Sequence, residues 1–314
     1  MMFGLRDSFV YFQCAECGCL QIAEFPIDMS RYYPTSYYSL ERLKTSPKSS
    51  GLRQWARLRR DEFAVIQRGL LGRVLDRISP NVGLKEVVAE HYPGGGVTLA
   101  NLSARSRILD VGCGSGRFLL KLHGAGFRSL QGVDLYVEKN IEYPEGLRIL
   151  KGSIGTCEGE WDVIMFHHSF EHLPDPLETL TTATRLLARD GTMVVRIPLV
   201  SSYAWEKYGV AWVQLDAPRH FFLHSRESMG RLAGAAGLRV ERVVDDSTEF
   251  QFLGSELYVR DIPLVSEGVY VLDAKGSIFG SVFSREEVQQ FRRLAGELRA
   301  GGRGDQAAFY LKKT

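Results

Sequence analysis

Hydrophobic positions change their spacing along the chain, and these changes predict its secondary structure. From residue 106 onward, short apolar runs alternate with segments in which apolar residues recur every three or four positions. Short apolar runs that end at glycines are typical of buried parallel strands, and spacings of three and four are typical of amphipathic helices. The alternation predicts an α/β domain with a mainly parallel sheet. The predicted strands are 108–111, 130–134, 147–150, 161–166, 193–197, 240–244 and 307–311, and the predicted helices lie around 118–124, 176–187, 225–237 and 285–298.

The chain before residue 106 lacks this alternation. Residues 1–50 are expected to be irregular, and residues 44–51 have the serine-rich composition of a linker. Residues 52–78 are predicted to form one helix, because their apolar positions keep a single helical spacing. The arginines on this helix could bind a membrane surface or a phosphorylated substrate. The favoured alternative is that they stay solvated while the apolar face of the helix packs on the domain. Residues 80–105 are predicted to be a loop or short elements.

Composition and charge narrow the class of protein. The 314 residues include 39 Lys and Arg and 37 Asp and Glu, which gives a formal net charge of +2. This near-balance argues against a nucleic-acid-coating protein and favours a small-molecule partner. No apolar stretch approaches the ~20 residues of a transmembrane helix, and no signal peptide is expected. Five cysteines, an odd number, argue against a secreted disulfide scaffold and favour a reducing cytoplasm.

A glycine-rich loop directly follows the strand predicted at 108–111. Gly112, Gly114 and Gly116 form a G-x-G-x-G pattern between a strand and a helix, which is the context that a nucleotide-type loop requires. The acid before the loop, Asp110, would repel a pyrophosphate but can receive an ammonium group. Asp134 ends the next strand, where a carboxylate can accept both hydroxyls of a ribose. The predicted ligand is a nucleoside with a cationic tail and no phosphate, a description that S-adenosylmethionine fits.

With these residues, the sequence resembles the class I S-adenosylmethionine-dependent methyltransferases. The matching segments are ILDVGCGSGRF (108–118), GVDL (132–135), WDVIMFHHSFEHLPDP (161–176) and DGTMVVRIP (190–198). The resemblance implies a Rossmann-like sheet of seven strands, whose antiparallel last hairpin pairs 240–244 with 307–311. It also implies a methyltransferase domain at 106–314, with acceptor-side insertions at 198–224 and 245–306, an irregular segment at 1–50 and a helical appendage or lid at 51–105.

The same resemblance assigns cofactor contacts to individual residues. Asp110 and the three loop glycines (Gly112, Gly114, Gly116) would cradle the methionine part of the cofactor. Asp134 would hold the ribose, and Leu135 would lie against the adenine. The chain departs from the family after the third strand, where an acid near the adenine amino group is common. Ser153 and Ile154 stand there instead, and Ser153 can accept a hydrogen bond.

Four ionisable side chains follow the fourth strand within six residues. The resemblance places this strand end opposite the methyl group, so His167 is expected to form a wall of the cofactor pocket. His168 is the candidate general base, since the pKa of histidine lies near working pH. Glu171 and His172 either join the acid–base chemistry or shape the loop that enters the next helix, and a structural role is favoured.

The insertion at 198–224 is rich in aromatic residues and resembles a D-x-P-R-H stretch of one methyltransferase branch. Arg219 and His220 therefore either bind the acceptor or act as base, or belong to a packed aromatic loop with a satisfied histidine. Cys14 and Cys17 have the spacing of half a zinc ribbon. A methyltransferase branch linked with sugars and other small acceptors carries a four-cysteine knuckle there, but this chain lacks the second pair. An incomplete zinc site, or a truncated start, is therefore expected.

The predicted function is S-adenosylmethionine-dependent methyl transfer to a small-molecule acceptor, and the resemblance alone favours a sugar or glycan precursor. Two alternatives remain. A catalytically silent module would bind the cofactor and serve as an interaction platform. A nicotinamide-dependent oxidoreductase is disfavoured, because Asp110 would repel a pyrophosphate and Arg117 replaces the last glycine of the dinucleotide fingerprint.

Overall fold

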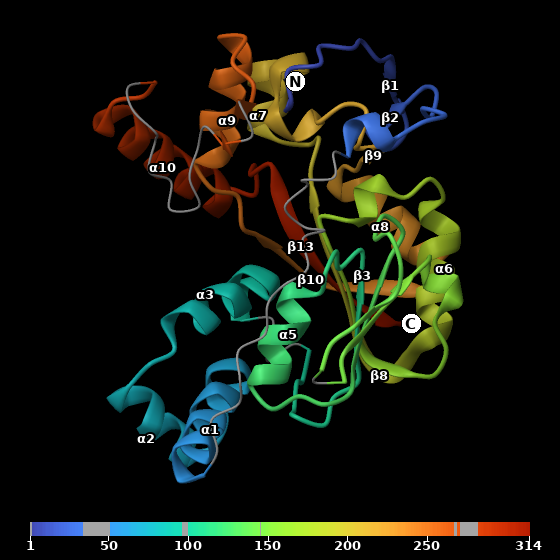
Figure 1. Ribbon diagram of the computed structural model, residues 1–314. Helices are drawn as coiled ribbons and strands as arrows, with labels where there is room; N and C mark the ends of the chain where they lie inside the picture. Colours follow the sequence, from blue (N-terminus) through green and yellow to red (C-terminus); the bar gives the residue numbers. More distant parts are fainter. Residues whose placement is uncertain (1, 34–50, 96–99, 145, 267–268, 271–281) are drawn as a thin grey trace.

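A single large sheet forms the centre of the molecule. The structure is a computed structural model that describes residues 2–33, 51–95, 100–144, 146–266, 269–270 and 282–314. The sheet has eight strands in the order β10-β13-β8-β7-β3-β4-β6-β5 (Figure 1). Their bounds are β3 Ile108–Val111, β4 Leu130–Asp134, β5 Ile141–Glu142, β6 Arg148–Lys151, β7 Trp161–His167, β8 Leu187–Pro198, β10 Leu238–Asp245 and β13 Gln306–Lys313.

The predicted parallel sheet with an antiparallel last hairpin is confirmed. Five strands pair in parallel with their neighbours, in the order β8, β7, β3, β4 and β6. Strand β13 runs antiparallel to both β8 and β10. The seven predicted strands are all present. The eighth strand, β5, contains two residues and pairs with the edge of β6. A two-residue strand carries no detectable period, and for this reason the sequence pattern did not predict it.

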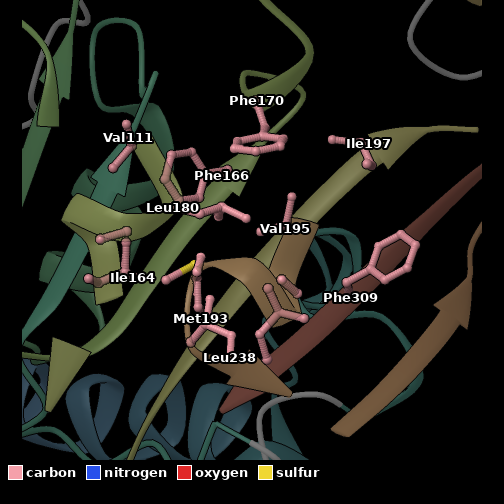
Figure 2. Close-up of a cluster of buried hydrophobic side chains, with 14 of the residues drawn as sticks. Val111, Ile164, Phe166, Phe170, Leu180, Met193, Val195, Ile197, Leu238 and Phe309 are labelled. Atoms are coloured by element: carbon pink, nitrogen blue, oxygen red, sulfur yellow. The ribbon is translucent and has the colours of Figure 1, made fainter. Parts of the chain in front are cut away.

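Helices cover both faces of the sheet. Their bounds are α1 Leu52–Ile66, α2 Leu70–Ile78, α3 Val82–His91, α5 Arg117–Gly124, α6 Pro176–Leu186, α7 Tyr203–Tyr208, α8 Arg226–Ala235, α9 Phe250–Val259 and α10 Arg285–Ala300. Helices α1, α3 and α5 supply side chains to the core on one face. Helices α6 and α8 pack on the other face, over a core that includes Phe166, Leu180 and Val195 (Figure 2). Successive residues of β7 point alternately into the two cores, as the pleat of a strand requires.

The N-terminal segment and the two insertions form a third packed region beyond the carboxyl ends of the parallel strands. Strands β1 (Tyr11–Gln13) and β2 (Leu20–Ile22) form a hairpin, and β9 (Phe222–Leu223) adds a third strand to it. Helices α7, α9 and α10 share a hydrophobic cluster with β2 and β9, and Trp212 is fully buried in it. The hairpin β11 (Val265–Ser266) and β12 (Val269–Tyr270) lies in the last insertion.

Two predictions for residues 52–105 are wrong in detail. The helix predicted over 52–78 is two helices, because Gln67 and Gly69 adopt positive φ angles of 56° and 103° between them. The two helices pack against each other, and each keeps its own apolar stripe, so the spacing across the turn resembled one face. The segment 80–105 contains a ten-residue helix, α3, whose first turn is capped by the side chain of Asn81.

Residues 1–50 were expected to be irregular, yet they contain the β1–β2 hairpin. The insertion at 198–224 contains α7 and two 3₁₀ turns, η5 (Gly209–Ala211) and η6 (Val213–Leu215). Most of the expected linker at 44–51 lies outside the described residues. In the described ranges, no helix is both long enough and apolar enough to cross a membrane.

The contact between α1 and α2 leads to a stability prediction. A Cβ atom on Gly72 would lie 2.6 Å from the Arg59 carbonyl oxygen, whereas a Cβ atom on Gly296 in α10 meets nothing within 4 Å. We expect Gly72→Ala to lower the free energy of unfolding by about 1–3 kcal/mol through overpacking. Gly296→Ala should raise it by about 0.5–1 kcal/mol, since alanine is the better helix former. Urea denaturation measures both, and equal effects in the two variants would contradict this account.

Candidate active site

A cavity of about 350 Å³ lies at the carboxyl ends of the parallel strands. Its lining comes from the ends of β3, β4, β7 and β8, from the segment after β6, and from helices α3 and α5. Ligand pockets of small-molecule enzymes are commonly about 300–1,000 Å³, and in open α/β sheets they lie at this edge. Ten residues predicted from the sequence line it: Asp110, Gly112, Gly114, Asp134, Leu135, Ser153, Ile154, His167, His168 and His172.

The glycine loop turns tightly between β3 and α5. Gly112, Gly114 and Gly116 have φ angles of 75°, 55° and 81°, which favour glycine. A Cβ atom on Gly112 would lie 2.2 Å from the Cβ atom of Ser169, so the loop needs glycine to approach the β7 end. Gly116 does not line the cavity. It starts α5 close to β6, and a Cβ atom there would lie 2.6 Å from Ile149 Cδ1.

Two buried carboxyl groups flank the loop. Asp134 accepts hydrogen bonds from the backbone N–H groups of Gly114 and Tyr136, both at 2.8 Å. Burial raises the pKa of Asp134, and these N–H groups partly counteract the shift. Among the described residues, Asp110 receives no such hydrogen bond, and burial together with the nearby Asp134 raises its pKa to about 8. A cationic group entering beside Asp110 would favour the ionised carboxylate.

Two buried histidines, His167 and His91, form another part of the cavity wall. Both ring nitrogens of His167 are buried and make no hydrogen bond with the described residues. Burial lowers the pKa of His167 well below its usual value, and it lowers that of His91 to about 3. His91 stacks on Phe118 with ring centroids 3.8 Å apart. These two histidines are therefore neutral at pH 7 and form a wall with unused hydrogen-bonding capacity.

The site fits S-adenosylmethionine on these observations. Its glycines hold the backbone in a cradle without side chains. Asp110 offers a carboxyl group for a cationic tail, and Asp134 retains acceptor capacity for hydroxyl groups beside its two backbone contacts. Leu135 is 42% exposed and offers an apolar surface next to Ser153 and Ile154 in the same cavity. His167 supplies polar atoms that lack a partner.

His168 occupies a strained position at the cavity wall. Its backbone has a positive φ of 49°, and its N–H donates to the carbonyl oxygen of Arg196 at 2.9 Å. The side chain is 32% exposed, and its Nδ1 lies 3.4 Å from Glu171 Oε1. A non-glycine residue in this region is uncommon and persists where the surrounding structure holds it.

Glu171 and His220 lie behind the cavity wall. Glu171 is fully buried, and although burial opposes its ionisation, His168, His172 and His220 together lower its pKa to about 2. His220 is 5% exposed, and its Nδ1 lies 2.7 Å from the carbonyl oxygen of Gln214. Burial lowers the pKa of His172 to about 4. The structure thus brings Glu171, His172 and His220 together, and of these only His172 reaches the cavity.

Cys14, Cys17 and Cys19 lie apart from this site, in and beside the turn of the β1–β2 hairpin. The backbone N–H of Gly18 donates to the carbonyl oxygen of Cys14, and backbone hydrogen bonds from Cys17 and Glu16 lower the pKa of the Cys14 thiol. Cys19 is buried, with Sγ 3.8 Å from His224 Nδ1. Within the described ranges, Cys14 and Cys17 belong to no group of three metal-ligating side chains.

Sequence analysis missed several residues that line the cavity. Arg196 on β8 is 8% exposed and donates from Nε to Asp246 Oδ2 at 2.5 Å. A lone charge within an apolar strand was a usable signal for it. Tyr33 stacks on Tyr136 with centroids 4.3 Å apart, and no local pattern indicated that partner. His91 lies on α3, and that helix was itself not predicted.

Comparison with solved structures and curated proteins returned methyltransferases. A S-adenosylmethionine-dependent methyltransferase from Archaeoglobus fulgidus aligns at 17% identity over 74% of this chain and 92% of its own, with a TM-score of 0.40. The 1,6-didemethyltoxoflavin-N1-methyltransferase of Burkholderia thailandensis aligns at 18% identity over 63% and 84%, with a TM-score of 0.36. A ubiquinone biosynthesis O-methyltransferase from Caulobacter sp. (strain K31) is 34% identical over 101 residues.

That last match covers 28% of this chain and spans 39% of the length of the Caulobacter relative. A family model described as a methyltransferase domain matches residues 71–243, which is more than half of the chain. The matched range includes the glycine loop, Asp134, the histidine segment after β7 and the insertion that carries His220. The chain belongs to this methyltransferase domain family, that of the class I S-adenosylmethionine-dependent methyltransferases.

Proposed function

We propose that this protein transfers a methyl group from S-adenosylmethionine to a hydroxyl group of a small-molecule acceptor. The observation that carries the proposal is one cavity in which a glycine loop, two buried acids and a partly exposed histidine meet. The Caulobacter relative is named an O-methyltransferase, which supports oxygen as the receiving atom. Sugars or glycan precursors are one acceptor class, and phenols are the other class that the name of this relative suggests.

The proposed roles divide between the strand ends. Residues at the ends of β3 and β4 hold the cofactor: Asp110 receives its ammonium group, Asp134 its ribose hydroxyls and Leu135 its adenine. Bound S-adenosylmethionine supplies a methyl group that its sulfonium already activates, so alignment accounts for most of the rate acceleration. His167 and His91 form another part of the cavity wall. Ser153 and Ile154 complete the adenine side.

His168 is proposed to accept the proton of the acceptor hydroxyl. Its Nδ1 faces Glu171, and a proton on that nitrogen leaves Nε2 with a lone pair. Glu171 is a positioning residue in this step, because it is fully buried and acts on the acceptor only through the orientation of His168. Nε2 of His168 then acts as the general base that accepts the proton from the acceptor hydroxyl.

Cofactor binding distinguishes this proposal from a nicotinamide-dependent oxidoreductase. The purified protein is expected to melt at a higher temperature with S-adenosylhomocysteine and at an unchanged temperature with NAD. Transfer of label from methyl-labelled S-adenosylmethionine to a panel of sugar nucleotides and polyphenols then tests catalysis. Binding without label transfer to either class would favour the catalytically silent module.

Asp134 is predicted to support cofactor affinity directly. In Asp134→Asn, the amide group cannot accept from both Gly114 and Tyr136, because one of its two ends is a donor. We expect the dissociation constant for S-adenosylhomocysteine to rise at least about 10-fold, the cost of losing a buried charged hydrogen bond. Isothermal titration calorimetry measures it, with the exposed Glu138→Gln as a matched control. Unchanged affinity in Asp134→Asn would remove this residue from the cofactor site.

Cofactor affinity is also predicted to depend on pH through Asp110. Its pKa of about 8 means that the carboxyl group is mostly protonated at pH 7 without ligand. A cationic ligand favours the ionised form, so binding releases a proton. Affinity for S-adenosylmethionine should rise by at most about tenfold per pH unit from pH 6 towards about pH 8, above which the ammonium group of the free cofactor begins to lose its own proton. Titrations from pH 6 to 9 check this, and Asp110→Asn should flatten the profile.

His168 is predicted to affect turnover more than binding. Asparagine tolerates the left-handed backbone of this position, so His168→Asn removes the ring and keeps the loop. With an acceptor identified from the panel, we expect kcat to fall about 10²–10⁴-fold, the range for loss of a general base. Affinity for S-adenosylhomocysteine should stay unchanged. His123→Gln, a histidine outside the cavity, is the control, and an unaltered kcat in His168→Asn would exclude the role.

A further inference from the structure

A second cluster of polar side chains lies behind the cavity wall. Glu171 and His172 belong to the 3₁₀ turn η4 (Phe170–His172), and His220 comes from the loop before β9. Each of the three residues places one potential ligand atom within 4.8 Å of the other two. The backbone fixes the two segments to each other, because the N–H of Phe221 donates to the carbonyl oxygen of Glu171 at 2.8 Å.

Within the described ranges, the carboxylate of Glu171 accepts no hydrogen bond that would balance its burial. It is fully buried, and neither carboxylate oxygen has a hydrogen-bond partner among the described residues. Its nearest ring nitrogens are His168 Nδ1 at 3.4 Å and His220 Nε2 at 4.0 Å. Buried carboxylates are ordinarily paired, hydrogen-bonded or bound to a metal. The guanidinium of the neighbouring Arg219 forms an ion pair with Asp216 at 2.5 Å.

The backbone sets the tautomers of the two histidines. Nδ1 of His172 lies 2.7 Å from the carbonyl oxygen of Arg219, and Nδ1 of His220 lies 2.7 Å from that of Gln214. A carbonyl oxygen only accepts, so Nδ1 carries the proton in both rings and Nε2 keeps its lone pair. Histidines that bind metals are oriented in this way, with the other ring nitrogen donating to a backbone carbonyl or a carboxylate.

The spacing favours a shared ion over a direct ion pair. His220 Nε2 lies 4.0 Å from Glu171 Oε1 and 3.7 Å from Asp216 Oδ2, and both distances are too long for hydrogen bonds. Ligand atoms bound at about 2.0–2.2 Å in a tetrahedral site lie roughly 3.4 Å apart. Small side-chain adjustments would bring the cluster to that separation. Two imidazoles and one carboxylate suit zinc and neighbouring divalent transition metals better than calcium.

We propose that Glu171, His172 and His220 form a binding site for a divalent transition-metal ion of the zinc type. His172 also lines the cavity, so the ion would lie at the cavity wall. Three protein ligands leave a coordination position for water or an acceptor oxygen. The acceptor-binding role of that position rests on the proposed methyl transfer, whereas the metal site itself does not.

Zn²⁺ binding to the full-length protein tests the site. Because Cys14 and Cys17 can bind Zn²⁺ separately, the titration uses both the wild-type protein and the Cys14→Ser/Cys17→Ser variant. We expect one Zn²⁺ to be retained by that variant after dialysis. Co²⁺ added instead should give a visible spectrum without the thiolate-to-metal band that a cysteine site produces. Zn²⁺ binding that disappears in the double-cysteine variant would overturn the proposal.

Ligand variants in the same double-cysteine background locate the ion. Glu171→Gln and His220→Gln should each weaken Zn²⁺ binding at least about 100-fold, because loss of even an outer partner of a metal ligand costs about 10–100-fold. His123→Gln should bind as the background does. Titration with S-adenosylhomocysteine shows whether each variant is folded, and it is independent of the metal. Zn²⁺ affinity that stays unchanged in folded Glu171→Gln would refute the site.

Discussion

The carboxylate of Asp134 holds the active-site edge of the sheet together. One oxygen accepts from the N–H of Gly114 in the loop after β3, and the other accepts from that of Tyr136 after β4. Two neighbouring strands therefore end at one buried charge, and the loop keeps its positive φ angles around it. The cavity forms on this edge because side chains from both strand ends, from β7 and from two helices converge there.

Burial around that edge decides which groups carry charge. His167 and His91 lose their protons because the cavity wall is shielded from water, while Asp110 holds its proton for the same reason. The two histidines of the pocket are thus neutral although Arg196 lies near them, while Asp110 can ionise when a cation enters beside it. Glu171 behaves in the opposite way, because three histidines surround it, and its carboxylate stays ionised deep in the protein. In the proposed function, this separation puts cofactor recognition and acceptor chemistry on different strand ends.

The sequence predicted helix starts and turns correctly where a few consecutive residues are enough to specify them. The capping of α6 by Asp175, the start of α8 at Ser225 and the turn at Gly112 each depend on a few consecutive residues. Prediction was wrong where a tertiary contact overrides the pattern. The spacing over 52–78 continues across a turn at which Gln67 and Gly69 take positive φ angles, and no residue there is a proline that would have marked the break.

The sequence by itself determined the seven predicted strands, the glycine loop with its two acids and the histidines that follow β7, because each depends on residue types at short separations. The tertiary structure alone decided which of these meet. His220 approaches Glu171 across 49 positions of the chain, Tyr33 stacks on Tyr136, and Gly116 faces Ile149 rather than the cavity. These contacts depend on how whole helices and strands pack against each other. Packing depends on the shapes of both elements, and the spacing of residues within one segment does not encode those shapes.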